Sequence, residues 1–171
     1  MLLRDVELGD LETYIRMRCD PAMMADLGGP LPRDGIEATV RRDVAWAAAG
    51  SHWIKMIVPD EATPEVVAGN VTLWTHEDDG EPASEIGWMV LPEFQGRGLA
   101  RWAARALLER ARDEERWGVV HAYPATTNGP SNGICRSLGF TLVGERDVTF
   151  ADRLLHTNHW LIDPQTALSQ G

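Results

Sequence analysis

Cysteines, which would indicate a disulfide-linked or metal-bound fold, are scarce in this sequence. It has only two cysteines in 171 residues, Cys19 and Cys135, which lie far apart and form no CxxC pair. This scarcity argues against a redox pair or a zinc site, and it fits a reducing compartment. A chain of this length can bury roughly 70% of the surface that it exposes when unfolded, so it needs neither disulfide nor metal to fold.

Long uncharged stretches and positive charge are also scarce. No segment approaches 18 uncharged apolar residues, and residues 1–5, MLLRD, reach charge at once. We therefore expect neither a membrane span nor a signal peptide. A cytoplasmic protein is the expectation that follows. Sixteen Lys and Arg against 26 Asp and Glu give a formal net charge of −10. This balance argues against nucleic acid or an anionic membrane as a partner and favours a cationic one.

Periodicity and turn residues divide the chain into strands and helices. Apolar runs bounded by Gly and Pro predict strands, and apolar residues at helical spacing predict helices. The expected strands cover residues 2–6, 53–58, 66–74, 85–90, 119–123, 140–143 and 154–162, and the expected helices cover 11–19, 35–49, 99–111 and 131–138. With no repeat, linker or low-complexity tract, this order predicts a single domain, residues 1–171, built on a mixed α/β sheet.

The most informative segment joins a predicted strand to the most strongly helical part of the chain. Residues 91–101, LPEFQGRGLAR, place Gly96 and Gly98 directly before that helix. The first N–H groups of a helix have no partner within it, and the peptide dipoles leave about half a positive charge there. Glycines let a bulky anion approach the backbone. The segment therefore predicts a phosphate-binding turn.

Three phosphate-binding patterns can be compared with this turn. A Walker loop requires GxxxxGK[ST], which the sequence lacks. A dinucleotide fingerprint GxGxxG would need glycine where Arg101 stands. The third pattern, Q/R-x-x-G-x-G/A, is met by Gln95, Gly98 and Ala100.

Arginines recur every four residues beside the turn, at Arg97, Arg101 and Arg105. They can form an ordinary solvated helix face, or one or two of them can contact ligand phosphates, with Arg97 favoured.

With the third pattern the chain resembles the GNAT superfamily of acetyl-coenzyme A dependent N-acetyltransferases. A later block, NGPSNGICRSLGF at residues 128–140, is similar to the family's motif of an Asn, a short helix and Gly-Phe, and EIGWMV at residues 85–90 is similar to its fourth strand. The likeness is closest over residues 66–145. It implies an α/β (α+β) fold with a mostly antiparallel sheet of six to seven strands, helices on both faces, and a splay between strands 4 and 5.

The resemblance also implies which residues hold acetyl-coenzyme A (acetyl-CoA). The opened backbone of the family's fourth strand, here Met89 and Val90, would bind the pantetheine arm. Asn128 and Ser131 would touch the coenzyme from the other side, although Asn128 can also be a turn residue ahead of a helix. The implied coenzyme contacts in the turn are Gln95, Gly96, Arg97, Gly98, Leu99 and Ala100.

We expect no metal in this site. His156 and His159 lie three residues apart on a predicted strand, which puts them on opposite faces and argues against joint metal binding.

Acetyl transfer from a thioester needs a neutral amine, yet an amine with a pKa of about 10.4 is almost fully protonated near pH 7. Similar family members place a glutamate at the head of the fourth strand, which implies Glu85 as the base; the alternative is a solvated or arginine-paired residue. Many relatives protonate the departing thiolate with a tyrosine where this chain has Cys135. Cys135 is therefore a candidate acid, with packing in the helix as the alternative and Ser131 or water as replacements.

The resemblance thus implies an N-acetyltransferase that moves the acetyl group of acetyl-CoA to a primary amine of a small molecule or protein by direct attack. The acidic composition favours a cationic acceptor, and Trp53, Trp74, Trp88 and Trp160 can line its pocket or pack in the core. Because the usual tyrosine is missing, a non-catalytic acyl-CoA-binding sensor or scaffold module is the alternative. The sequence leaves the oligomeric state open, a homodimer included.

Overall fold

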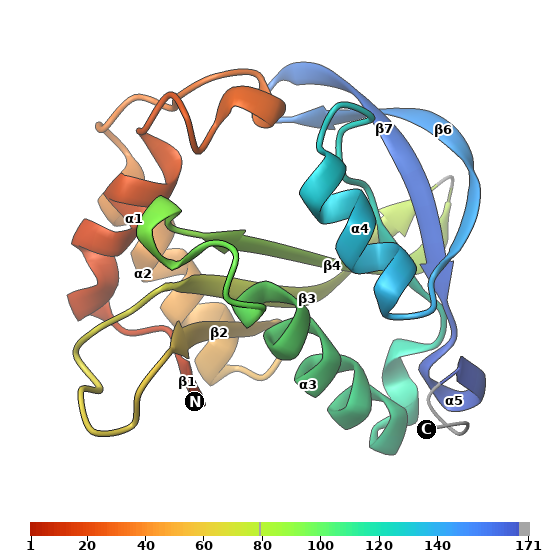
Figure 1. Ribbon diagram of the computed structural model, residues 1–171, viewed down its shortest axis with the longest axis horizontal. Helices are drawn as coiled ribbons and strands as arrows, with labels where there is room; N and C mark the ends of the chain where they lie inside the picture. Colours follow the sequence, from red (N-terminus) through yellow and green to blue (C-terminus); the bar gives the residue numbers. More distant parts are fainter. Residues whose placement is uncertain (79, 168–171) are drawn as a thin grey trace.

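The protein folds around one seven-stranded sheet. The computed structural model describes residues 1–78 and 80–167, and its strands lie in the order β1-β2-β3-β4-β5-β7-β6 (Figure 1). The pair β4 and β5 is parallel, and the other neighbouring strands are antiparallel. The strands are β1 (Leu2–Asp5), β2 (Trp53–Val58), β3 (Gly69–Asp78), β4 (Glu81–Val90), β5 (Val120–Ala122), β6 (Thr141–Phe150) and β7 (Arg153–Ile162).

Helices cover both faces of the sheet. They are α1 (Leu11–Arg18), α2 (Ile36–Ala48), α3 (Leu99–Asp113), α4 (Gly129–Ser137) and α5 (Pro164–Ala167). The helices α1 and α2 pack on one face and α3 and α4 on the other (Figure 1). Among the described residues, no helix has the length and hydrophobicity needed to cross a bilayer.

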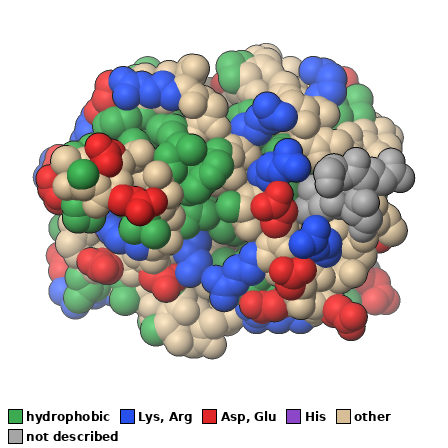
Figure 2. All heavy atoms as spheres, turned by 60° about the horizontal axis from the view of Figure 1, so that its bottom comes forward, with side chains coloured by type: hydrophobic (Ala, Val, Ile, Leu, Met, Phe, Trp, Pro, Cys, Tyr) green, Lys and Arg blue, Asp and Glu red, His purple; other side chains and the backbone are tan. Residues whose placement is uncertain are grey.

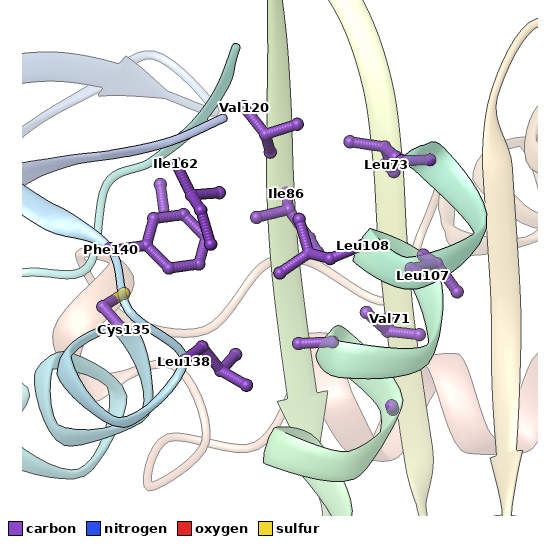
Figure 3. Close-up of a cluster of buried hydrophobic side chains, with 14 of the residues drawn as sticks. Val71, Leu73, Ile86, Leu107, Leu108, Val120, Cys135, Leu138, Phe140 and Ile162 are labelled. Atoms are coloured by element: carbon purple, nitrogen blue, oxygen red, sulfur yellow. The ribbon is translucent and has the colours of Figure 1, made fainter. Parts of the chain in front are cut away.

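The longest helix, α3, lies on the sheet through one apolar stripe. Leu107 and Leu108 point toward Val71, Leu73 and Ile86 of the central strands (Figure 3). The stripe follows the helical spacing that the sequence shows from Leu99 onward, and its opposite face carries the arginines. This packing fixes the start of α3 at the end of β4.

The neighbouring strands β4 and β5 separate after a short contact. Their parallel pairing covers only Ser84 with Val120 and Glu85 with His121, whereas β3 accompanies β4 along its whole length to Val90. The end of β4 therefore has no strand neighbour on its β5 side among the described residues. This arrangement confirms the splay expected between strands 4 and 5.

The expected mixed sheet with helices on both faces is confirmed, but several element boundaries differ. The strand expected at 140–143 continues to Phe150, and the strand expected at 66–74 covers Gly69–Asp78 instead. The sequence also predicts a loop over residues 78–82, but Asp78 belongs to β3 and Glu81 and Pro82 belong to β4, with Asp78 paired to Glu81; residue 79 lies outside the described residues. The added residues of β6 are mostly polar, so their sequence lacks an apolar strand signal; β7 supplies their pairing partners.

The N-terminal third contacts the C-terminal hairpin at the top of Figure 1. The Arg153 guanidinium, at the β6–β7 turn, donates to the carbonyls of Gly29 and Pro30 in the segment between α1 and α2. The Thr127 hydroxyl donates to Asp26 of the same segment over 2.7 Å. The segment between α1 and α2 is thus held to the distant end of the sheet.

Candidate active site

The glycine turn leads directly into α3. Gly96 and Gly98 have φ of 73° and 76°, in the left-handed region that favours glycine, and an added Cβ at either would meet nothing within 4 Å. Within the described residues, the backbone N–H groups of residues 96–100 have no hydrogen-bond acceptor. An open surface with several unpaired N–H groups at a helix start fits a phosphate group.

Two side chains of the turn fold back on the backbone and brace it. The Gln95 side-chain amide donates to the Val90 carbonyl over 2.8 Å, and the Arg97 guanidinium donates to the Glu93 carbonyl over 2.8 Å. Arg97 also lies over the ring of Phe94, with 5.4 Å to the ring centroid. These residues hold the turn against the end of β4, so the turn and the splayed strand form one unit.

The helix α3 carries exposed arginines beyond the turn. Arg101 and Arg105 are exposed, and Arg105 forms an i,i+4 ion pair with Glu109. On the face that carries α3, Figure 2 shows Lys and Arg side chains spread through the middle, with Asp and Glu between them. Local positive charge therefore exists on a molecule whose net charge is negative.

The end of β4 is held against β3 by a close backbone contact. A Cβ at Gly69 would lie 2.0 Å from the Met89 carbonyl oxygen, so only glycine fits there. The Leu91 N–H donates to the Ala68 carbonyl over 2.8 Å just beyond this contact. Met89 packs against the cluster under α1 and α2, and Val90 against the cluster under α3. The splayed backbone at Met89 and Val90 is thus anchored from its β3 side.

The opposite side of the splay is formed by the start of α4. The Asn128 side chain accepts the Ser131 N–H over 3.0 Å and is the N-cap of α4. Across the splay, the Trp88 indole N–H of β4 donates to the Ser131 hydroxyl oxygen over 3.3 Å. Because an indole N–H can only donate, Ser131 accepts this bond, and its own O–H proton remains available to another acceptor.

Farther along α4, Cys135 faces the core. Its side chain is fully buried and lies near Leu138 and Phe140 (Figure 3). Burial raises the pKa of the Cys135 thiol to about 12. A thiol with that pKa and no solvent exposure is a poor proton donor near neutral pH.

Asn132, which the sequence analysis did not single out, fixes α4 to the sheet. Its side-chain amide donates to the carbonyls of Ala125 and Asn128, and its oxygen accepts from Asn158 and Trp160 of β7. It is 6% exposed, and all four contacts are 2.9 Å or shorter. Only the packed structure brings these partners together, so the local motif gave no signal for this role.

The carboxylate Glu85 lies on the other face of the sheet. It pairs with Trp74 on β3 and His121 on β5, while the adjacent Ile86 enters the core beneath α3. Side chains alternate along a strand, so Glu85 points away from α3. Its side chain is 23% exposed. Burial, and then the charge of Asp78, raises the pKa of the Glu85 carboxyl to about 7.

A polar cluster surrounds Glu85 on this face; we call it the Glu85 cluster, and it also contains His76, Asp78, His121, Tyr123, Arg146 and His159. The His121 Nδ1 lies 3.0 Å from the Tyr123 hydroxyl and 3.0 Å from His159 Nε2. Burial is the main cause that lowers the pKa of both His121 and His159. These rings are therefore mostly neutral at pH 7.

An ion pair closes the cluster on the β6 side. The Arg146 guanidinium donates to both Asp78 oxygens, over 2.7 and 2.5 Å, and this bonding holds the pKa of Asp78 below its usual range. The cluster draws on β3, β4, β5, β6 and β7, and its members are scattered from residue 76 to 159. Sequence reasoning missed all of them except Glu85 as site residues, because no local spacing connects them.

Of the four tryptophans considered as pocket residues, two are buried in the core. Trp53 packs edge-on against Trp117, and Trp160 is held by Asn132. Trp88 contacts Ser131, and the Trp74 ring lies over Gly87, where an added Cβ would be 3.7 Å away. Trp74 shares a face with Glu85 and is half-buried.

The chain is similar to known acetyltransferases in sequence pattern and in fold. A family model described as an acetyltransferase (GNAT) domain matches residues 1–141. The coenzyme A complex of RimL, a ribosomal-protein alpha-N-acetyltransferase, is similar in structure with a TM-score of 0.75 and 16% identity, over 95% of this chain and 93% of that one. A chimera of spermidine N-acetyltransferase SpeG from Vibrio cholerae and hSSAT has a TM-score of 0.76 and 18% identity, over 99% and 98%.

A third similar structure holds the acetyl donor itself. The microcin C7 self-immunity acetyltransferase MccE, in complex with acetyl-CoA and AMP, has a TM-score of 0.72 and 17% identity, over 94% of this chain and 91% of that one. At such identities the likeness concerns the fold.

Proposed function

Because the chain belongs to the GNAT acetyltransferase family, whose members depend on acetyl-CoA, we propose that it transfers acetyl from acetyl-CoA to a primary amine by direct attack. The observation that carries this proposal is the position of Glu85, a half-buried carboxyl with a pKa of about 7, on the strand that leads to the glycine turn. A base on β4 and a phosphate-binding turn directly after β4 suit a reaction that transfers the acyl group of a coenzyme thioester to an amine.

The coenzyme site is made by the turn and the two sides of the splay. The free N–H groups of residues 96–100 would hold the pyrophosphate, and the backbone at Met89 and Val90 would hold the pantetheine arm. Gln95 and Arg97 act by bracing the turn, and Asn128 acts by capping α4. Bound acetyl-CoA would supply the thioester carbonyl that the amine attacks.

The carboxylate of Glu85 would take a proton from the acceptor. An ammonium group must lose one proton before its nitrogen can attack, and a second after the new C–N bond forms. The thiolate that leaves takes up one proton, so one proton in total is released to solvent. A carboxyl with a pKa of about 7 is partly ionised at neutral pH and a stronger base than an exposed glutamate. A backbone N–H near Met89 would stabilise the oxyanion.

The departing thiolate would take its proton from Ser131 or from water. The Ser131 hydroxyl accepts from Trp88 at the splay, which leaves its own proton free to be donated. We assign Cys135 a packing role, because its thiol is fully buried and burial raises its pKa to about 12. Coenzyme thiolate is a fair leaving group, so a weak donor suffices.

The acceptor is a primary amine of a small molecule or of a protein. The similar structures differ in the acceptor that their names give: a ribosomal protein for RimL and spermidine for SpeG. The net charge of −10 attracts a cationic acceptor. We place the reaction in the cytoplasm, in keeping with two free cysteines.

The second candidate is a non-catalytic acyl-CoA-binding sensor or scaffold, which the burial of Cys135 at the usual tyrosine position favours. A panel of amines, including polyamines, amino-sugars and peptide N-termini, would be assayed for release of free coenzyme thiol, with calorimetry of acetyl-CoA binding in parallel. Amine-dependent release supports the enzyme. Tight binding without release on any amine would favour the sensor, and absence of binding would contradict both.

A further inference from the structure

The contacts of the histidine next to Glu85, His76, indicate the tautomer of its neutral ring. The His76 Nδ1 lies 3.2 Å from the backbone carbonyl of Glu77 in hydrogen-bonding geometry. A carbonyl oxygen can only accept, so Nδ1 carries a proton in the neutral ring. The other ring nitrogen, Nε2, is therefore the one that binds and releases a proton.

This second nitrogen faces the carboxylate. The His76 Nε2 lies 3.1 Å from Glu85 Oε2. The approach is close but not aligned as a hydrogen bond, and Nε2 has less than 1 Å² exposed and no hydrogen-bond partner among the described residues. Hydrogen bonds at catalytic groups are often misaligned before substrate binds and become aligned in the complex. Without a proton between them, a lone pair and a carboxylate oxygen would repel each other.

From this juxtaposition we propose that His76 is a positioning residue for the base: in the reactive state no proton lies between Glu85 Oε2 and His76 Nε2, and the pair then accepts and shares the single proton that the acceptor ammonium loses. This inference rests on the proposed function and deepens it. The proton moves from the ammonium nitrogen to Glu85 Oε2 and is shared with His76 Nε2, and it leaves to solvent after the amide has formed. One N–H bond breaks and one O–H or N–H bond forms, with no change of oxidation state.

The other groups on this face do not take the place of His76. Asp78 is ion-paired with Arg146, and the rings of His121 and His159 contact each other and the Tyr123 hydroxyl. Among the described residues, a direct contact with the Glu85 carboxylate is observed for His76. A proton shared between two groups belongs to both, so removal of one partner changes how the other binds it.

The test is a nuclear magnetic resonance pH titration of the His76 ring carbons in the wild-type protein and in Glu85→Gln. We expect two transitions at His76 in the wild type and a single, shifted transition in Glu85→Gln. Identical His76 titration curves in the two proteins would overturn the pairing. Because this readout needs no turnover, an inactive wild type with coupled titration would contradict the proposed function and leave the pair intact.

A kinetic test uses His76→Gln, with His156→Asn as the matched control. His156 also contacts two carboxylates, Asp147 and Glu145, but is exposed and outside the Glu85 cluster. We expect His76→Gln to lower kcat about tenfold at pH 7, to shift the acidic limb of the pH profile and to leave the KM for acetyl-CoA unchanged. His156→Asn should match the wild type. An unshifted profile in a His76→Gln protein with a wild-type circular dichroism spectrum would contradict the proposal.

Discussion

Glu85 combines low exposure with the charge that its proposed role as a base requires. Burial raises its pKa from 4.5 to about 7, so the folded protein binds this proton more tightly than the unfolded chain does. The protonated carboxyl therefore contributes stability that is fully present below about pH 4.5 and is lost as the pH rises toward 7. An ionised carboxylate in this place is unfavourable by about 3 kcal/mol, at about 1.4 kcal/mol for each tenfold change in proton affinity.

Replacement of Glu85 by Gln should consequently stabilise the fold at high pH. Gln is neutral at all pH values and has a similar shape, so we expect the free energy of unfolding to rise by about 1–3 kcal/mol at pH 8 and to change little below pH 4.5. Urea denaturation at both pH values would measure this. A variant less stable than the wild type at pH 8 would show that the carboxylate is held by favourable contacts.

The same substitution should slow acetyl transfer. Without the base, reaction depends on the small fraction of neutral amine, and we expect kcat/KM to fall by about 100-fold near pH 7 and by much less at high pH, where amines lose their proton unaided. The rate of thiol release from pH 6 to pH 10 checks this. Equal rates for both proteins below pH 8 would remove Glu85 as the base.

Among the elements, the turn before α3 can be tested at Gly98, beside the space that the pyrophosphate would occupy. Gly98 has a φ of 76° and open space at its Cβ position, beside N–H groups without acceptors. We expect Gly98→Asp to abolish acetyl-CoA binding, because it places a carboxylate against the pyrophosphate. Gly139→Asp is the matched control: Gly139 has a φ of 87° and open space but lies after α4. Calorimetry that finds Gly98→Asp binding as tightly as the control would contradict this placement.

The start of α4 offers a second test at the level of an element. Ser131 lies opposite β4 and accepts from Trp88, so Ser131→Ala removes the proposed proton donor and leaves the backbone of the helix cap in place. We expect kcat to fall about tenfold or more, with a much smaller change in the Kd for acetyl-CoA. Cys135→Ser tests packing and should lower the melting temperature. A large loss of kcat in a stably folded Cys135→Ser, with Ser131→Ala fully active, would reverse these roles.

Elements whose signal is local could be predicted from the sequence, and those that depend on distant partners could not. The glycine turn and α3 each lie within one short segment, so spacing alone indicated them; for Asn128, a turn residue ahead of a helix was one of two interpretations. The polar strand β6 is stabilised by pairing with β7, and Asn132 by partners on β7, which no local pattern encodes. The contact of His76 with Glu85 depends on the register of β3 and β4.

At the scale of the whole molecule, the groups proposed for the coenzyme and for the acceptor lie on opposite faces of the sheet. The α3 side carries the turn and Ser131 at the splay, and the opposite side carries Glu85 and its cluster. The donor and the acceptor would then approach the splay of β4 and β5 from different sides. The contacts of Arg153 and Thr127 with the segment between α1 and α2 join the N-terminal third to the hairpin β6–β7.

The most direct test of acetyl transfer to an amine is the release of free coenzyme thiol from acetyl-CoA by the wild-type protein, measured with and without each amine of the panel at pH 8. We predict release that depends on at least one amine, saturates with its concentration and is strongly reduced in Gly98→Asp. Tight acetyl-CoA binding with no amine-dependent release across the panel would contradict it.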